Sequence, residues 1–453
     1  MAGAKDIPVV RSFYTIPGLA STYHFLWAWG GAAVHRAPSR KLCVIGVTGT
    51  KGKTTTLELV NAMLEAAGKR TALLSSLRVK IGGETHKNQT GNSMPGRAYL
   101  QRFLRNAARA ECEYALIEVT SQGIAAHRHR FIDWKIGVIT NLSPEHIEAH
   151  GSFENYRAAK LDFLKYVVRG GGEVLLNRDD AHFVFFSAAL GGGGAEGIAG
   201  NISAFSQHDD WLAHHLSEMK GAVRAAATPP AAAPKFFLSD FNEQNIAAAA
   251  AVAKKFGIAD APIRAALEHF AGVPGRMEFV VSDAYTVVVD YAHTPDSLEA
   301  AYKAVKPKPN EAYPDPRLIC ILGSAGGGRD RWKRPRMGQI AAEYCDELVL
   351  TDEDPYDEDP KKIIEEIRAG VTAAARAPRG VYEILDRRDA VKKAFALARV
   401  GDVVIGTGKG SEDWIHVAQG KRIPWNEKKV FEEALAEKAR GDSRADAAGK
   451  AGE

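Results

Sequence analysis

The segment at residues 44–56 has residue types that suit binding of a phosphorylated ligand. It reads VIGVTGTKGKTTT, so an apolar run leads into a glycine-rich turn and then into an expected helix. Glycines let successive backbone N–H groups point at an anion, and the start of the helix adds its positive end. Lys53 supplies a mobile positive charge for the outer phosphates, and Thr54 supplies a hydroxyl for Mg²⁺. The segment therefore predicts a phosphate-binding loop.

The spacing of this loop departs from the general pattern at one position. That pattern has a glycine five residues before Gly52, where this chain has Val47, and Gly46 lies one residue too early. A glycine-rich turn without a ligand is the alternative. We favour the phosphate loop because Lys53, followed by three threonines, has no packing rationale.

Other polar residues follow later apolar runs. Glu118 ends one run, and a carboxylate at the carboxyl end of a strand suits Mg²⁺ or its water shell, although a solvent-facing glutamate is equally compatible. His146 and His150 lie in a loop, where imidazoles either ligate a second metal or are simply exposed. By composition alone, Lys160 is an ordinary lysine on a helix surface. Individually, these residues leave the function open.

A glycine turn followed by dense positive charge occupies residues 326–334. A solvated basic loop would have this composition. Arginine forks that recognise a carboxylate or a phosphate would have it too.

Strands and helices alternate from residue 41 onward. This alternation predicts an α/β protein with a central, doubly wound, mostly parallel sheet, in which ligands bind beyond the carboxyl ends of the strands. A turn-rich junction near residue 275 precedes a second series, which predicts a Rossmann-like α/β domain. The expected strands span residues 42–47, 71–74, 114–119, 136–140 and 173–176, then 285–290, 318–322, 347–350 and 402–405.

This pattern divides the chain into a short N-terminal segment (1–40), a central domain (41–275), a C-terminal domain (276–430) and a flexible tail (431–453). The aromatic stretch 19–34 is shorter than the roughly 20 residues that a spanning helix needs. We expect it to pack on the next domain as a helix, and an interfacial membrane contact is the alternative. We expect no stable membrane insertion.

The composition is that of an ordinary soluble protein. Of 453 residues, 45% are apolar and 25% are charged, and the net charge of +4 is too small to indicate nucleic-acid binding. The cysteines are widely spaced and no secretory signal is evident, so we expect a cytoplasmic protein with buried reduced thiols rather than a disulfide or zinc site. The sequence does not settle the oligomeric state, and a monomer is the default expectation. The cysteines are Cys43, Cys112, Cys320 and Cys345.

Together these motifs resemble the Mur ligase family, the ATP-dependent ligases that build the peptidoglycan stem peptide. The specific resemblance is to the MurE type, which adds a diamino acid (lysine or diaminopimelate) to UDP-N-acetylmuramoyl-L-Ala-D-Glu. It covers roughly residues 41–430 through several ordered motifs. The matching stretches are 48–56, 118–121, 140–143, 156–160, 275–278, 290–296 and 329–335.

The resemblance implies ATP, two Mg²⁺ sites and a lysine carbamylated by CO₂. The implied catalytic residues are Lys53, Glu118, His146 and Lys160. The implied metal ligands are Thr54, Glu118, His146 and Lys160 as a carbamate. The implied ATP contacts are Gly49, Thr50, Lys51, Gly52, Lys53, Thr54, Thr55, Asn242, Asn245, Arg276, Asp290, Tyr291 and His293.

The resemblance also implies residues for the other two substrates. For the muramoyl-dipeptide these are Asn92, Ser93, Met94, Ser121 and Arg128. For the incoming amino acid they are Arg329, Asp354, Tyr356, Gly408 and Glu412.

The implied reaction forms an amide bond in two steps. A substrate carboxylate attacks the γ-phosphate of ATP and gives an acyl phosphate and ADP, and the incoming amine then displaces phosphate. Two alternatives remain, a related ligase of the folyl-polyglutamate or cyanophycin type, and a nucleotide-binding scaffold without ligase activity. The joint presence of Lys53, Thr54, Glu118, His146 and Lys160 argues against the scaffold.

Three departures from the family pattern affect the substrates. Only about 40 residues precede the phosphate loop, where the family has a full uridine-binding domain, so UDP is either held differently or lacking. The motif Asp-Asn-Pro-Arg of diaminopimelate-selecting enzymes is replaced by residues 353–356, in which Tyr356 carries no charge, so lysine becomes more plausible. Glu145 and Gln122 replace a common Asp and His, and both changes are mild.

Overall fold

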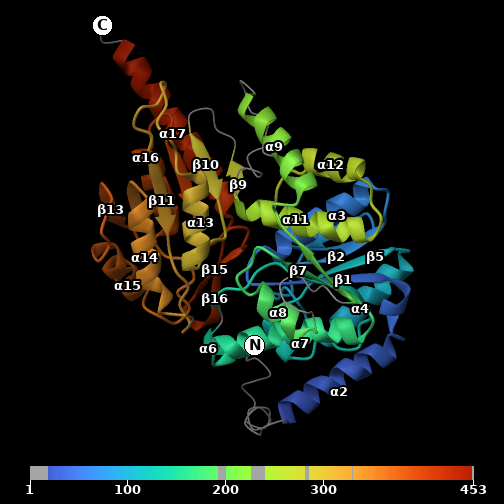
Figure 1. The fold of residues 1–453 in the computed structure, drawn as a ribbon. Coiled ribbons are helices and arrows are strands. Elements are labelled where there is room, and N and C mark those ends of the chain that lie inside the picture. Colours follow the sequence, from blue (N-terminus) through green and yellow to red (C-terminus); the bar gives the residue numbers. More distant parts are fainter. Residues whose placement is uncertain are drawn as a thin grey trace. The chain divides into compact units, whose positions relative to one another are not determined.

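Apolar residues at alternating strand and helix positions build two large sheets, beside a separate two-stranded one (Figure 1). The computed structural model describes residues 19–145, 147–191, 200–225, 240–280, 285–328 and 330–450. The chain divides into two compact units. The first comprises Met1–Ser217 and Asn242–Phe270, and the second comprises Glu218–Phe241 and Ala271–Glu453.

The sheet of the first unit has the strand order β4-β3-β2-β5-β1-β6-β7-β8. Its six strands from β2 to β8 are parallel, which confirms the predicted central sheet, and β3 and β4 add an antiparallel edge. The strands are β1 (Cys43–Thr48), β2 (Thr71–Leu74), β3 (Arg78–Ile81), β4 (Glu84–Lys87), β5 (Tyr114–Glu118), β6 (Trp134–Ile139), β7 (Glu173–Asn177) and β8 (Ile202–Phe205).

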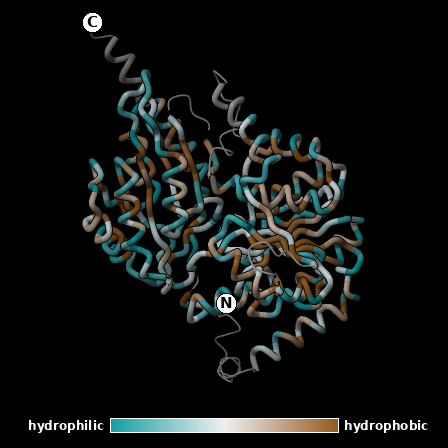
Figure 2. Tube along the Cα trace, in the orientation of Figure 1, coloured by the Kyte–Doolittle hydropathy of each residue, from teal (hydrophilic) through white to brown (hydrophobic). Residues whose placement is uncertain are grey.

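Helices flank this sheet, and the expected N-terminal helix is present. The helices are α2 (Leu19–Val34), α3 (Lys53–Ala66), α4 (Arg97–Arg109), α5 (Ser121–Ala125), α6 (Ile147–His150), α7 (Phe153–Arg169), α8 (Phe183–Ala189), α9 (Asp210–Ala225), α11 (Asp240–Lys255) and α12 (Asp260–Glu268), with the 3₁₀ turn Pro38–Lys41. Figure 2 shows that the most hydrophobic segments are the strands, which lie between these helices.

Gly46 has a packing role, which explains its position outside the phosphate-loop pattern. A Cβ atom on Gly46 would lie 2.6 Å from the ring of Phe163 and 2.8 Å from that of Trp134. Both rings are buried and meet edge to face at 5.2 Å between centroids. Strand β1 therefore needs glycine here so that α7 can pack on it.

The sheet of the second unit has the order β13-β12-β11-β14-β10-β9 and is parallel except for β9. The predicted Rossmann-like α/β domain is therefore present. Its strands are β9 (Glu278–Val280), β10 (Thr286–Val289), β11 (Leu318–Leu322), β12 (Glu347–Leu350), β13 (Gly380–Glu383) and β14 (Val403–Gly406), with a separate hairpin of β15 (Trp414–Val417) and β16 (Lys421–Pro424). Its helices are α13 (Pro295–Val305), α14 (Lys333–Tyr344), α15 (Pro360–Thr372), α16 (Arg387–Leu397) and α17 (Glu427–Lys450), with the 3₁₀ turn Ala418–Gly420.

The tail expected from residue 431 lies largely in helix α17, which runs from Glu427 to Lys450. Phe431 is fully buried, and Ala434 is 5% exposed. At the start of the helix, Arg387 and Glu427 form an ion pair of 2.6 Å with both side chains fully buried. The prediction rested on the charged composition of this segment, in which only a few apolar residues pack the helix on its own domain.

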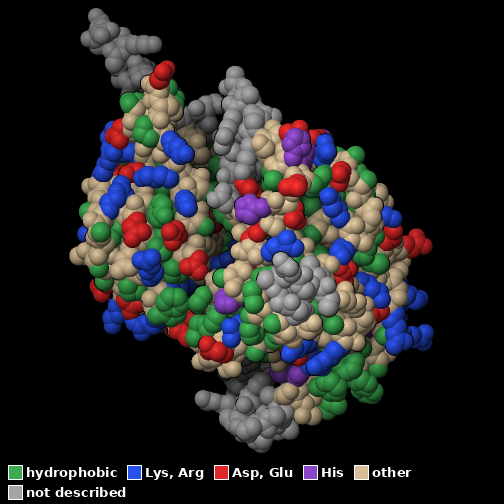
Figure 3. Space-filling model, in the orientation of Figure 1, with side chains coloured by type: hydrophobic (Ala, Val, Ile, Leu, Met, Phe, Trp, Pro, Cys, Tyr) green, Lys and Arg blue, Asp and Glu red, His purple; other side chains and the backbone are tan. Residues whose placement is uncertain are grey.

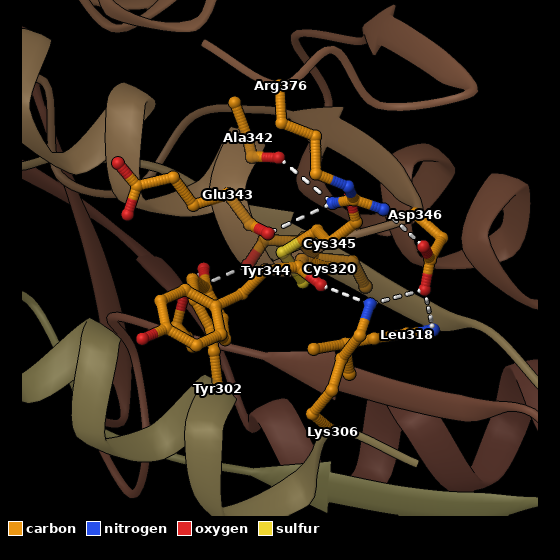
Figure 4. The surroundings of a disulfide bond; sticks show 12 residues. Tyr302, Lys306, Leu318, Cys320, Ala342, Glu343, Tyr344, Cys345, Asp346 and Arg376 are labelled. Atoms are coloured by element: carbon orange, nitrogen blue, oxygen red, sulfur yellow. Dashed lines mark hydrogen bonds and ion pairs between the residues drawn. A yellow bond between two sulfur atoms is a disulfide. The ribbon is translucent and has the colours of Figure 1, made fainter. Parts of the chain in front are cut away.

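The prediction of four reduced thiols is wrong for Cys320 and Cys345, which form a disulfide (Figure 4). Cys320 lies on β11 and Cys345 directly follows α14, with 6.0 Å between their Cα atoms. Their 25-residue separation conceals this proximity, because α14 returns the chain to the strand next to β11. Cys43 and Cys112 are free thiols, as predicted.

No helix in the described part of the chain is long and apolar enough to cross a membrane. The aromatic helix α2 has 16 residues.

The buried Arg387–Glu427 pair gives a prediction about stability. We expect Glu427→Gln to lower the free energy of unfolding by about 3 kcal/mol, because the guanidinium is left buried without its counter-charge. Urea unfolding followed by circular dichroism measures this change. The matched control is Glu437→Gln, since Glu437 pairs with Lys392 at 3.2 Å with side chains 58% and 47% exposed. We expect this control to change stability by less than about 0.5 kcal/mol, and equal effects would contradict the prediction.

Candidate active site

The turn between β1 and α3 has room only for glycine at two positions. Gly49 and Gly52 have φ values of 143° and 82°, which other residues rarely adopt. A Cβ atom on Gly49 would lie 2.0 Å from Thr140 Oγ1, and one on Gly52 would lie 2.1 Å from Asn245 Oδ1. The loop is thus enclosed by two other segments of the same unit.

The segment after β6 holds the loop in place. Asn141 Oδ1 accepts a hydrogen bond from Lys51 N at 2.8 Å, and Thr140 Oγ1 donates to Lys51 O at 2.6 Å. The backbone N–H of Thr50 donates to Asn141 O at 3.0 Å. These bonds fix the loop backbone, and no side chain caps the N-terminus of α3 by a hydrogen bond. The first N–H groups of α3 are therefore available to an anion.

Lys53 is the first residue of α3 and folds back over the loop. Its Nζ donates to Gly49 O at 3.1 Å and to Thr50 O at 2.9 Å. The positive charge of Lys53 is thereby held at the loop, and its phosphate-binding role stays a prediction.

A hydroxyl and a carboxylate meet beside the loop. Thr54 Oγ1 donates to Glu118 Oε2 at 2.9 Å, and Glu118 also accepts from Ser76 N at 2.9 Å. The side chain of Glu118 is buried at the end of β5, which pairs with β1. These oxygen donors are those that Mg²⁺ prefers. Ser76 was missed from the sequence, although it follows the carboxyl end of β2 in the same sheet.

The donor set fits a magnesium ion that keeps other oxygen ligands. Among the described residues, no group of three or more His, Cys, Asp and Glu side chains gathers as a metal site. Thr54 and Glu118 would thus share such an ion with water and phosphate oxygens. The predicted ligand His146 lies outside the described residues.

Lys160 is buried, which corrects the surface position that composition alone indicated. It is 1% exposed, and its Nζ donates to Gly49 O at 2.7 Å. Burial holds the pKa of Lys160 well below its ordinary value, and the positive charge of Lys53 acts in the same direction. The amine is therefore biased to its neutral, nucleophilic form next to the phosphate loop.

Glu145 and Tyr156 contact side chains of the loop near Lys160. Glu145 Oε1 lies 2.8 Å from Lys51 Nζ, and its side chain is buried. The hydroxyl groups of Tyr156 and Thr50 are 3.0 Å apart, and Lys160 Nζ lies 4.5 Å from the centre of the Tyr156 ring. Tyr156 thus contacts both the loop, through Thr50, and Lys160.

The asparagines expected near the adenine lie on α11. Asn245 Nδ2 donates to Asn242 Oδ1 at 3.2 Å, and both side chains are buried. Because Asn245 also borders Gly52, α11 lies against the phosphate loop. The remaining predicted loop residue, Thr55, is buried within α3.

The residues expected to bind a muramoyl-dipeptide divide into a fixed group and an exposed loop. Met94 is fully buried, and its carbonyl accepts a hydrogen bond from Arg128 Nη1. Ser121 Oγ lies 3.0 Å from His150 Nε2, which gives His150 a structural partner. Asn92 is exposed, and its Nδ2 donates to Thr90 O at 3.3 Å, while Ser93 follows it in the same loop. The side chain of Met94 is therefore part of the hydrophobic core.

In the second unit, the loop after β10 has a fixed conformation. Asp290 accepts hydrogen bonds from Met277 N at 2.7 Å and from Ala292 N at 2.8 Å. The Arg276 guanidinium lies over the Tyr291 ring at 4.1 Å, and His293 Nδ1 lies 2.8 Å from Tyr291 O. The structure therefore brings the four predicted nucleotide-contacting residues of this unit together.

A charged network adjoins this loop. Lys409 is fully buried, and its Nζ lies 2.9 Å from Asp354 Oδ1 and 2.6 Å from Glu412 Oε2. Tyr291 OH donates to Glu412 Oε1 at 3.1 Å, so the network connects to the loop after β10. Sequence reasoning missed Lys409, although it lies between Gly408 and Gly410 directly after a strand.

Tyr356 and Gly408 lie at the border of this network. Tyr356 stacks on His416 at 5.1 Å between ring centroids with an interplanar angle of 16°. A Cβ atom on Gly408 would lie 2.3 Å from Glu353 Oε2, and burial raises the pKa of Glu353 to about 7. His416 was a second omission from the sequence prediction, and the predicted Arg329 lies outside the described residues.

Two protein-family models match two consecutive parts of the chain. The Mur ligase middle domain matches residues 47–253, and the Mur ligase, glutamate ligase domain matches residues 275–410. A relative from Roseiflexus sp. (strain RS-1), named UDP-N-acetylmuramyl-tripeptide synthetase, is 37% identical over 422 residues, which cover 90% of this chain and 81% of the relative. The chain belongs to the Mur ligase family.

Other relatives agree with this Mur ligase assignment. A protein of Syntrophomonas wolfei, named UDP-N-acetylmuramoyl-L-alanyl-D-glutamate--2,6-diaminopimelate ligase, is 33% identical over 89% of this chain and 80% of the relative. A solved structure of a ligase with the same name aligns with a TM-score of 0.54 and 26% identity over 88% of this chain and 79% of that chain. Folylpolyglutamate synthase of Mycobacterium tuberculosis shares the fold, with a TM-score of 0.61 at 16% identity and coverage of 88% and 96%.

Burial of Lys160 gives a prediction about the pH dependence of stability. Between its lowered folded pKa and its ordinary value, the unfolded chain binds more protons at Lys160 than the folded chain does. Stability therefore rises with pH across this window, by at most about 1.4 kcal/mol per pH unit for one proton. We expect Lys160→Met to reduce this slope in magnesium-free, CO₂-free buffer, measured by urea unfolding from pH 7 to 10. Lys165→Met, on the same helix, is the control and keeps the wild-type slope. Identical slopes in all three proteins would contradict the prediction.

Proposed function

We propose that this Mur ligase is a MurE-type enzyme, which uses ATP to join a diamino acid to UDP-N-acetylmuramoyl-L-Ala-D-Glu in peptidoglycan synthesis. One observation carries the proposal. Lys53, the Thr54–Glu118 pair and the buried Lys160 meet at a single loop. Relatives with tripeptide-synthetase and diaminopimelate-ligase names, 33–37% identical over about 90% of the chain, support the choice within the family.

The loop residues have defined tasks in phosphoryl transfer. The backbone N–H groups at the start of α3, from Lys53 onward, and the Lys53 ammonium hold the phosphates of ATP and stabilise charge on the oxygens of the transferred group. Thr54 and Glu118 would hold Mg²⁺, which neutralises phosphate charge when bound. The dipeptide carboxylate takes the γ-phosphoryl group, the bond to the bridging oxygen of ADP breaks, and an acyl phosphate results. The amine of the diamino acid then replaces phosphate and loses a proton.

Lys160 has the environment that carbamylation requires. The nitrogen lone pair of a neutral amine attacks the carbon of CO₂, an N–C bond forms, and one proton leaves to solvent. The product is an anion in place of a cation. Desolvation, together with the charges of Lys53 and Lys51, favours the neutral amine that begins this step. A carbamate at this position would supply oxygen ligands for a second Mg²⁺, with His146 as the other proposed ligand.

Within the second unit, two groups would serve the nucleotide and the amino acid. Arg276, held over Tyr291, presents a guanidinium suited to phosphate oxygens. Asp354, Glu412 and Lys409 form a polar network suited to an amino acid with both charges. We propose diaminopimelate as the diamino acid because several relatives carry that name, with Arg329 as the cation for its distal carboxylate.

A substrate screen tests the proposed reaction. We expect ADP and phosphate release only when a muramoyl-dipeptide and a diamino acid are both present, with diaminopimelate above lysine, ornithine and glutamate. UDP-muramoyl-dipeptide and its UDP-free version are compared in parallel, and mass spectrometry identifies the tripeptide. Dihydrofolate with glutamate is the control for the folate type. Turnover of the folate pair alone would overturn the proposal, and equal rates with lysine would remove the preference for diaminopimelate.

Replacing Lys160 tests the carbamate. We expect Lys160→Ala to lower kcat at least about 100-fold, because a metal-binding anion is lost from the site. Acetate or propionate, which restores a carboxylate in the vacated space, is expected to recover part of the rate. Lys165→Ala on the same helix serves as the matched control and keeps normal activity. An unchanged rate of ADP release in Lys160→Ala would disprove the role of the carbamate.

A further inference from the structure

Helix α2 presents its large apolar side chains to solvent and its small ones to the protein. The buried residues of α2 are Ala28, Gly31 and Ala32, which follow a helical spacing of three and four. A Cβ atom on Gly31 would lie 3.5 Å from the Ala98 Cα atom, so α2 and α4 approach closely. The exposed residues include Tyr23 (46%), Leu26 (56%), Trp27 (55%), Trp29 (57%) and Val34 (72%).

This arrangement is the reverse of an ordinary surface helix, which buries its large apolar residues. Figure 3 shows hydrophobic side chains gathered over the position of α2 in Figure 1. A contiguous apolar patch of this kind marks an interaction surface. The ring of Phe25 meets that of Phe131 at 5.1 Å and remains 42% exposed, whereas the rings of Tyr23 and Trp27 meet each other within α2 at 6.2 Å. We refer to the exposed residues of α2 as the aromatic patch.

Positive charge borders the aromatic patch. Neither residues 19–41 nor residues 97–110 contain an Asp or Glu. Arg102 and Arg105 of α4 both lower the pKa of His35, so their charges lie near the end of α2. The exposed cations of the two segments are Arg36, Arg40, Lys41, Arg102 and Arg109.

We propose that the aromatic patch and its basic border bind the surface of an anionic phospholipid membrane. Trp and Tyr side chains favour the interface between water and acyl chains, and Arg and Lys bind lipid phosphates. Helix α2, with 16 residues, spans about 24 Å, which is shorter than the hydrocarbon core of about 30 Å. It therefore lies along the interface as a peripheral anchor. This binding is separate from the proposed ligase reaction.

Charge favours lipid over a second copy of the chain as the occupant. A symmetric dimer through this surface would bring the same patch of each subunit together. The arginines and lysine of one border would then lie near those of the other, and like charges oppose such pairing. An anionic membrane instead provides a counter-charge for every exposed cation.

Vesicle binding by the full chain tests the proposal. We expect sedimentation with phosphatidylcholine vesicles that contain 30% phosphatidylglycerol, much less with pure phosphatidylcholine, and a decrease as salt rises. Arg36→Gln with Arg40→Gln is expected to weaken binding about 30-fold, since each cation near an anionic surface contributes about 1 kcal/mol. Trp27→Ala with Trp29→Ala is expected to abolish binding. These positions face solvent, so the fold is retained, and circular dichroism verifies this.

Matched controls lie on the second unit. Trp414→Ala removes another tryptophan that is 40% exposed, and Lys361→Gln with Lys362→Gln removes two exposed cations. We expect both controls to bind vesicles as the wild type does. Quenching of tryptophan emission by brominated lipid should be lost with Trp27 and Trp29. Equal binding to both vesicle types, unchanged binding by the double variants, or a lipid-independent dimer that depends on Trp27 and Trp29 would each overturn the proposal.

Discussion

The candidate site depends on the close approach of three segments to the loop at residues 49–52. Thr140 and Asn245 occupy the space that a side chain at Gly49 or Gly52 would need, and Lys160 donates to the Gly49 carbonyl. The loop is consequently a surface of backbone groups enclosed by side chains from the segment after β6, from α7 and from α11. Backbone amides fixed in this way bind phosphate without reorganising, which is the physical basis of electrostatic preorganisation.

Three lysines around one loop create an electrostatic constraint. Lys51 is paired with Glu145, Lys53 is held by loop carbonyls, and the pKa of Lys160 is lowered by burial. A concentration of positive charge that is only partly compensated is suited to a polyanion such as a triphosphate. The neutral form of Lys160 relieves this repulsion, and in the function proposed above it is the form that reacts with CO₂.

In the second unit, buried charges of opposite sign compensate one another. Lys409 is fully buried between Asp354 and Glu412, and the Tyr291 hydroxyl extends the network toward Arg276. Buried ions require such partners because an uncompensated charge in the interior is costly. The described residues leave the aromatic patch of α2 exposed to solvent. For that reason we assign it a partner outside the chain.

The sequence by itself determined the glycine-rich turn between the first strand and helix, the parallel sheet of each unit and the family, because short stretches of characteristic residue types and spacing specify these features. Predicted strands such as 71–74, 318–322 and 347–350 have the observed bounds. Only the tertiary structure decided that Gly46 serves packing, that Lys160 is buried, that Cys320 meets Cys345 and that α2 turns its small residues inward. Short strands at or near the sheet edges, and the separate hairpin, were missed, because such short runs acquire a strand conformation only by pairing with a neighbouring strand. These are β3, β4, β8, β9, β13, β15 and β16. Each of these depends on which distant segments become neighbours, and a local pattern of residue types does not specify that.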